Sequence, residues 1–163
     1  SNLYWISIGD SPLFLFRDGA LVQLNEDHSM APQIDFMVKS GLMAPEEGAC
    51  HPDRNVLTSV LFGDDIPKID CPTEPVELVD DDILIVASDG LQYLSNEQIE
   101  AALRRNCHRS SNEIVDTLMY QVTGLDDPDL DNVSLSLVKL QSNAAGRSSR
   151  SGQQLRSDIR CVG

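Results

Sequence analysis

The chain has 163 residues, a length that suits one domain, and 41% of them are hydrophobic, which is enough for a buried core. Its formal net charge of −14 disfavours nucleic acid as a partner and favours cations. No apolar run approaches the roughly 18 residues of a membrane span. The four cysteines form no CxxC pair, so a zinc ribbon is not expected. The lack of a secretory signal favours free thiols in a reducing cytoplasm over a disulfide framework, and no membrane partner is expected.

The first half of the chain is expected to begin with strands and to continue with helices. Turn residues, proline and hydrophobic spacing set the boundaries of these segments. The predicted elements are a strand and turn over 3–11, a β-hairpin over 13–25, a helix that ends near Gly41, a short helix over 45–52 and a strand over 55–63.

The second half is expected to hold a strand, two helices and a closing strand. The apolar run 83–87 predicts the first strand, and the alternating residues 132–140 predict the last. Between them, Ser95 and Ser110 each begin a sequence typical of a capping box at a helix start. Strands in runs and helices in a pair indicate an α+β sandwich of antiparallel sheets. The domain is expected to span 3–140, and the polar residues 141–163 are expected to form a flexible tail.

Acidic residues stand at the ends of three predicted strands. They are Asp10 in Gly-Asp-Ser, Asp89 in Ser-Asp-Gly, where Gly90 follows, and Asp131 in Asp-Asn. Strand ends gather at one edge of a sheet, so these carboxylates are predicted to converge on Mg²⁺ or Mn²⁺, which prefer oxygen ligands. The alternative is that each aspartate only shapes a turn, which is ordinary chemistry for Asp beside Gly or Ser.

Other kinds of site fit the sequence less well. Asp127, Asp129 and Asp131 match the start of a calcium-binding EF-hand loop, but Asn132 stands where glycine is required and Val138 where glutamate is required. The chain has no GxSxG nucleophile motif, no P-loop and no dinucleotide-binding glycine pattern.

The histidines also offer little sign of catalysis. Cys50-His51 and Cys107-His108 are sequence neighbours, whose side chains point apart on a strand or helix. His28 is interpreted as a loop residue and not as a catalytic base.

Four motifs together resemble those of the type 2C, metal-dependent serine/threonine protein phosphatases, the bacterial branch above all. They occur in family order and spacing, and read WISIGDSPLFLFRDGALVQLNEDHS, HPDRNVLTSVLFGDD, LIVASDGLQYLSNEQI and DNVSLSLVKL. The resemblance covers about residues 3–140. It implies an αββα sandwich and a two-metal centre that uses Mn²⁺ or Mg²⁺, where a metal-activated water hydrolyses phosphoserine or phosphothreonine in a protein substrate.

The resemblance also implies roles for individual residues. Asp89, with Gly90 beside it, and Asp131 resemble the ligands of the first catalytic metal. Asp10 resembles a residue that helps to hold a third, weaker metal. Pro12 stands where many relatives have arginine, and residues 37–63 resemble the flap that influences access of the substrate.

One part of the family pattern has no counterpart in the sequence. The Asp-Gly-x-Gly-Gly motif, whose aspartate bridges both metals, does not occur. The chain is therefore expected to match the C-terminal portion of the phosphatase domain and to be inactive alone. A missing N-terminal half or a second copy is expected to cover an exposed apolar face. The alternative is a non-catalytic, phosphatase-like binding or regulatory module.

Overall fold

The computed structural model describes residues 1–63, 65–125 and 132–141 together with the backbone of 156–162. The chain divides into two compact units. The first unit contains Ser1–Leu3, Pro12–Leu24 and Pro75–Gly163, and the second contains Tyr4–Ser11 and Asn25–Glu74.

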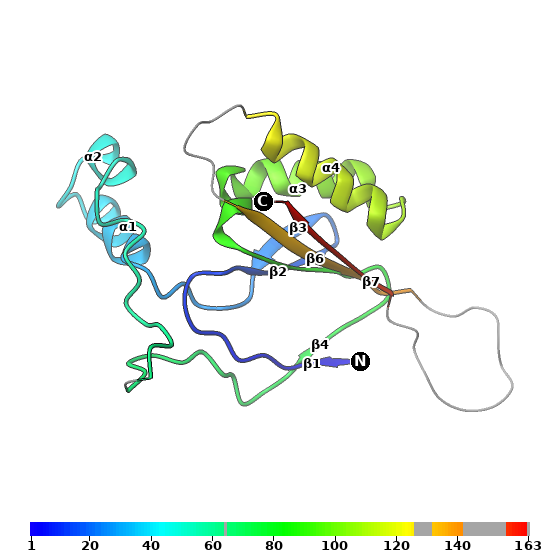
Figure 1. Ribbon diagram of the computed structural model, residues 1–163, viewed down its shortest axis with the longest axis horizontal. Helices are drawn as coiled ribbons and strands as arrows, with labels where there is room; N and C mark the ends of the chain where they lie inside the picture. Colours follow the sequence, from blue (N-terminus) through cyan, green and yellow to red (C-terminus); the bar gives the residue numbers. More distant parts are fainter. Residues whose placement is uncertain (64, 126–131, 142–155, 163) are drawn as a thin grey trace, which may run out of the picture. The chain divides into compact units, whose positions relative to one another are not determined.

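The first unit is built on a five-stranded antiparallel sheet with the strand order β3-β2-β5-β6-β7 (Figure 1). The strands are β2 (Leu13–Arg17), β3 (Ala20–Gln23), β5 (Ile83–Ala87), β6 (Val133–Lys139) and β7 (Arg156–Val162). A small second sheet pairs β1 (Asn2–Leu3) with β4 (Val76–Glu77) in antiparallel fashion. The predicted α+β class with antiparallel sheets is confirmed.

Two helices pack over one face of the five-stranded sheet, α3 (Asn96–Asn106) and α4 (Ser111–Thr123). Alternate residues of the strands point toward them and form the main core together with the helices' apolar faces. Side chains from the opposite face form a smaller cluster with residues near β1 and β4. Its buried members are Leu15, Leu78, Leu84 and Leu140.

Local sequence signals explain how several of these elements begin and end. The hairpin turns at Asp18 and Gly19, whose φ angles of 52° and 81° are those of a two-residue turn that matches the twist of the strands. Both predicted capping boxes are present, at Ser95 with Gln98 and at Ser110 with Glu113. These serines fix the first residues of α3 and α4.

The second unit contains two short helices, α1 (Ala31–Lys39) and α2 (Pro45–Ala49), as the sequence predicts. The predicted strand over 55–63 is wrong. In the part of the chain that the structure describes, this segment makes a single bridge, between Leu57 and Ser29. The bridge is formed by the bond from the Thr58 amide to the His28 carbonyl and the bond from the Met30 amide to the Val56 carbonyl. The Thr58 hydroxyl also donates to the His28 carbonyl. The strand expected within 3–11 is likewise reduced to Leu3 and one bridge at Ser7.

The segment expected to be a flexible tail contains a strand. Residues Arg156–Val162 form β7, which pairs with all seven residues of β6. An edge strand presents unpaired N–H and C=O groups, so a polar segment without hydrophobic alternation can still pair with it. The remaining tail residues, 142–155 and 163, lie outside the described part of the chain.

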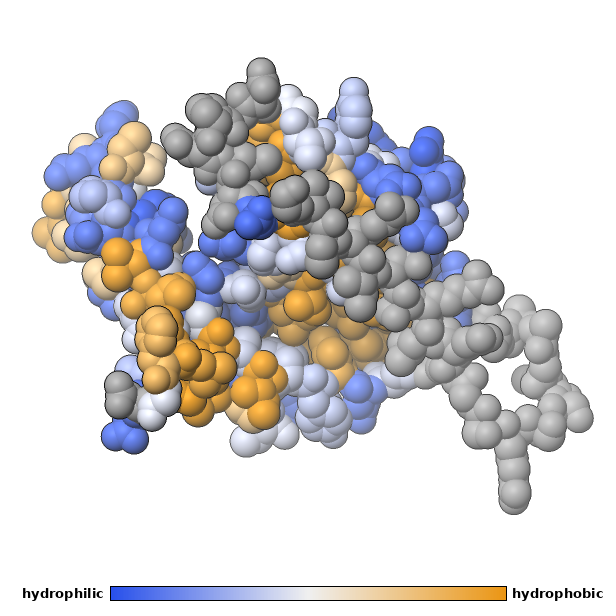
Figure 2. Space-filling model, in the orientation of Figure 1, coloured by the Kyte–Doolittle hydropathy of each residue, from blue (hydrophilic) through white to orange (hydrophobic). Residues whose placement is uncertain are grey.

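The second unit exposes large apolar side chains, among them Leu42, Leu61 and Phe62, which are 70–86% exposed. Figure 2 shows apolar surface over the segment that links α2 to β4. The prediction that a partner covers such surface remains a prediction. Among the described residues, no helix combines the length and apolar character needed to span a bilayer.

Candidate functional site

The candidate site is the loop Ser88-Asp89-Gly90, where β5 ends and the 3₁₀ helix η1 (Asp89–Tyr93) begins. Ser88 joins this loop to the start of β6. Its amide donates to the Ser134 carbonyl at 2.9 Å, and its hydroxyl accepts from the Ser134 amide at 3.0 Å. The same hydroxyl donates to the Asn132 carbonyl at 3.2 Å. Ser88 thus fixes the backbone immediately before Asp89.

Gly90 is required by the closeness of the same two strand ends. A Cβ atom at this position would lie 2.7 Å from the Asn132 carbonyl oxygen and 2.9 Å from Cγ2 of Val133. Real Cβ contacts are not that short, and a backbone oxygen held in a strand end cannot move aside easily. The absence of a side chain therefore lets the Asp89 loop pack against the residues that follow Asp131.

The two ends of β5 carry carboxylates in opposite environments. Asp82, just before the strand, is 1% exposed, and Arg17 donates to both of its oxygens at 2.8 and 2.6 Å. Burial alone would raise the pKa of Asp82, but the hydrogen bonds from Arg17 and the Val79 amide, with the charge of Arg17, lower it. Asp89 is exposed, and no described residue donates to its carboxylate. Asp82 therefore stabilises the fold through its pair with Arg17, whereas the carboxylate of Asp89 is accessible to a ligand.

The structure brings together only part of the predicted metal site. Asp131 lies outside the described residues, although its neighbour Asn132 contacts the Asp89 loop. Asp10 belongs to the second unit, whereas Asp89 and Gly90 belong to the first. The convergence of the three carboxylates therefore stays a prediction.

The loop that carries Asp10 has its own support within the second unit. The Gly9 amide donates to Nδ1 of His28 at 3.3 Å, and the His28 amide donates to the Gly9 carbonyl at 3.0 Å. Asn25 donates from its amide nitrogen to the Ser11 carbonyl at 2.9 Å. His28 lies in a loop, as predicted, but it is 1% exposed, and its contacts with Gly9 could not be predicted from the residues around it.

The donors at the Asp89 loop suit a hard cation in kind but are too few. Mg²⁺ and Mn²⁺ take several oxygen ligands, and this loop supplies one described carboxylate. Among the described residues, no three His, Cys, Asp or Glu side chains are grouped closely enough to hold a metal ion. A metal centre here would need further donors.

Comparisons with known proteins identify the fold and its relatives. No family model matches the chain. Its sequence is 30% identical to a putative 2C-type protein phosphatase of Streptococcus pyogenes over 145 residues, which cover 87% of the chain and 54% of the relative. It is also 30% identical to the protein phosphatase PhpP of Streptococcus pneumoniae, over 85% of the chain and 53% of the relative. The chain spans about half the length of the curated relatives it matches.

Comparison with solved structures leads to the same kind of protein as the comparison of sequences. A serine/threonine phosphatase of S. agalactiae superposes with a TM-score of 0.69 at 29% identity, over 85% of the chain and 54% of that structure. The PPM Ser-Thr phosphatase MsPP of Mycobacterium smegmatis, crystallised with cacodylate, gives a TM-score of 0.59 at 28% identity, over 82% and 54%. The fold is therefore that of bacterial serine/threonine phosphatases. In sequence and in fold, the chain is a relative of the type 2C, or PPM, family over about half of the family's length.

Proposed function

We propose that this chain supplies part of the active site of a metal-dependent phosphatase that removes phosphate from phosphoserine and phosphothreonine in protein substrates. The observation that carries the proposal is the Asp89 loop. Its carboxylate is exposed and has no partner among the described residues, while Ser88 and Gly90 fix its backbone against the residues after Asp131. A carboxylate held rigidly but left without a protein partner is suited to a cation.

In this proposal, Asp89 and Asp131 bind one Mn²⁺ or Mg²⁺ ion, with Gly90 in the same loop, and Asp10 helps to bind a further, weaker ion. Such an ion supplies activation of water for in-line attack on the phosphoryl group. The chain's own contribution is to orient these carboxylates. Because the described donors are few, the isolated chain is expected to bind Mn²⁺ weakly and to show little or no turnover.

The decisive experiment uses the natural protein that contains this chain. Mn²⁺-dependent hydrolysis of a phosphothreonine peptide is measured for the wild type and for Asp89→Asn and Asp131→Asn. Both substitutions are expected to abolish metal-dependent turnover, because each removes a charged ligand. Asp80→Asn, which changes an exposed aspartate outside the loop, is the matched control and is expected to keep full activity.

Two outcomes would contradict the proposal. Full turnover by Asp89→Asn would show that Asp89 is not a metal ligand. No turnover by the wild type at saturating Mn²⁺, with no Mn²⁺ binding by calorimetry, would support a non-catalytic module instead.

A further inference from the structure

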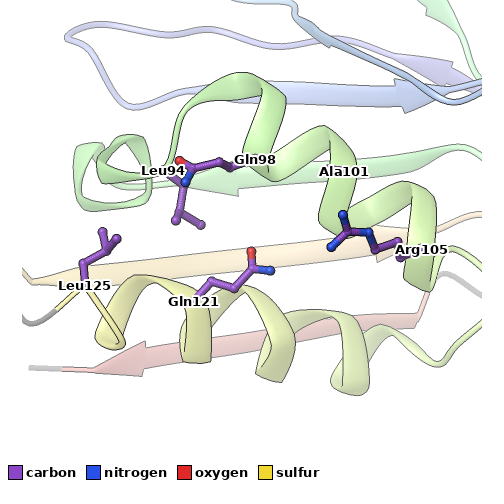
Figure 3. Close-up of a pocket in the computed structure, with 6 residues that line it drawn as sticks. All are labelled: Leu94, Gln98, Ala101, Arg105, Gln121 and Leu125. Carbon is purple, nitrogen blue, oxygen red and sulfur yellow. The ribbon is translucent and has the colours of Figure 1, made fainter.

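A cavity of about 300 Å³ lies between α3 and α4 in the first unit. Figure 3 shows its lining side chains, which come from both helices and from the residues beside them. They are Leu94, Gln98, Ala101, Arg105, Gln121 and Leu125. None of these residues belongs to the proposed metal site, so the cavity is distinct from that site.

One end of the cavity is polar and incompletely hydrogen bonded. The side-chain oxygen of Gln121 is buried, and no described group donates to it. A buried acceptor without a donor is unfavourable and is uncommon in folded proteins. A ligand with an N–H group would satisfy it.

Arg105 adds a positive charge at the same end. Its guanidinium and the Gln121 amide both point into the space between the helices (Figure 3). The preceding residue, Arg104, is engaged: it donates to Glu100 at 2.7 Å and to the Gly19 carbonyl at 2.6 Å. Arg105 has no ion pair in the part of the chain that the structure describes. Its planar fork of donors is suited to a carboxylate.

The other end of the cavity is apolar. Leu94, 3% exposed, follows η1 directly, and Leu125 follows the end of α4. Gln98 also lies at this end, but its oxygen already accepts from the Ser95 amide at 2.8 Å in the capping box. A ligand here would place an apolar group against the two leucines.

We propose that this cavity binds an N-acylated apolar amino acid, the chemical group found at the carboxyl end of a peptide. In such a group the carboxylate and the N–H sit on one carbon atom, so they can reach Arg105 and Gln121 together, while the side chain lies against Leu94 and Leu125. The volume is at the lower end of the roughly 300–1,000 Å³ of small-molecule sites, which fits one residue better than a longer ligand.

The test is a titration of the protein with N-acetyl-L-leucine, followed by the amide chemical shifts of α3 and α4. Saturable shifts confined to these helices are expected. N-acetyl-L-leucinamide, which lacks the carboxylate, is expected to bind at least tenfold more weakly. Arg105→Gln should weaken binding by a similar factor, whereas Arg109→Gln, an exposed arginine outside the cavity, should leave it unchanged.

Gln121→Met separates a binding role from a structural one. The change keeps the side-chain size and removes the unpaired oxygen, so the melting temperature should stay the same or rise while ligand affinity falls. An octapeptide ending in leucine, compared with its C-terminal amide, distinguishes a peptide end from a free amino acid. The proposal fails if none of these probes shifts the helices at millimolar concentration, or if Arg105→Gln and Gln121→Met bind like the wild type.

Discussion

Ser88 and Ser134 exchange two hydrogen bonds, one from the Ser88 amide to the Ser134 carbonyl and one from the Ser134 amide to the Ser88 hydroxyl. Ser88→Ala removes the second bond and also the bond to the Asn132 carbonyl. We expect a loss of about 1–3 kcal/mol in the free energy of unfolding, because two bonds are lost and the Ser134 amide keeps no side-chain acceptor. Urea unfolding followed by circular dichroism measures this loss.

Ser136→Ala is the matched control for Ser88→Ala. Ser136 is half-buried, like Ser88, and lies two residues after Ser134 in β6. Its hydroxyl makes no hydrogen bond in the described structure. Its substitution should change stability by less than about 0.5 kcal/mol. Equal losses in the two variants would show that the Ser88 hydroxyl does not hold the Asp89 loop.

Gly90→Ala tests the close approach of the two strand ends. The new methyl group would meet the Asn132 carbonyl oxygen at 2.7 Å, so the loop or β6 must shift, at a cost of about 1–3 kcal/mol. Gly124→Ala should cost less, since its nearest contact is 3.0 Å and its φ of −77° suits any residue. Thermal melts of both variants give the comparison, and a Gly90→Ala protein as stable as the wild type would mean that the contact relaxes freely.

Local signals in the sequence predicted the elements that local interactions determine. The capping boxes at Ser95 and Ser110 and the hairpin predicted over 13–25, which turns at Asp18-Gly19, need only neighbouring residues, and all three are present. The prediction of a strand over 55–63 was wrong because β-branched residues indicate a strand only where a partner strand is available. Strand β7 was missed for the opposite reason, since its partner β6 and not its own hydrophobic pattern determines its pairing.

The candidate site shows the same division. A carboxylate at the end of an apolar strand is visible in the sequence, so Asp89 could be singled out. The hydrogen bond that holds its loop could not be predicted, because Ser88 and Asn132 are 44 residues apart and neither residue type is unusual. Asp82 is paired with Arg17, and Asp89 has no partner in the described part of the chain. This contrast likewise depends on contacts across the sheet.

The pair of Arg17 and Asp82 predicts a pH-dependent part of stability. The folded-state pKa of Asp82 is lowered, so its stabilisation is complete above the unfolded-state value of about 3.9 and is lost as the pH falls through the folded-state pKa. Asp82→Asn should therefore lose about 1.5–3 kcal/mol near pH 7. The difference from the wild type should shrink below about pH 4, as measured by urea unfolding at several pH values.

Asp35→Asn provides the comparison for that series. Asp35 pairs with Arg54 at 2.7 Å, but its side chain is 48% exposed, so its loss should cost no more than about 1 kcal/mol. If Asp82→Asn and Asp35→Asn lost the same free energy of unfolding, the buried pair of Arg17 and Asp82 would contribute no more to stability than an exposed ion pair does.

His28 gives a prediction about the loop that carries Asp10. Its Nδ1 atom accepts from the Gly9 amide inside the second unit, so His28→Leu leaves that amide without its acceptor. We expect amide hydrogen exchange at Gly9 to become about 10- to 100-fold faster, which corresponds to about 1–3 kcal/mol of lost protection.

His28→Asn should recover part of this protection, because the oxygen of asparagine can take the place of Nδ1. His51→Leu, which removes an acceptor for the Asp53 amide in the same unit, should leave exchange at Gly9 unchanged. Unaltered exchange at Gly9 in His28→Leu would mean that the histidine only fills space, and the position of Asp10 would then depend on other contacts.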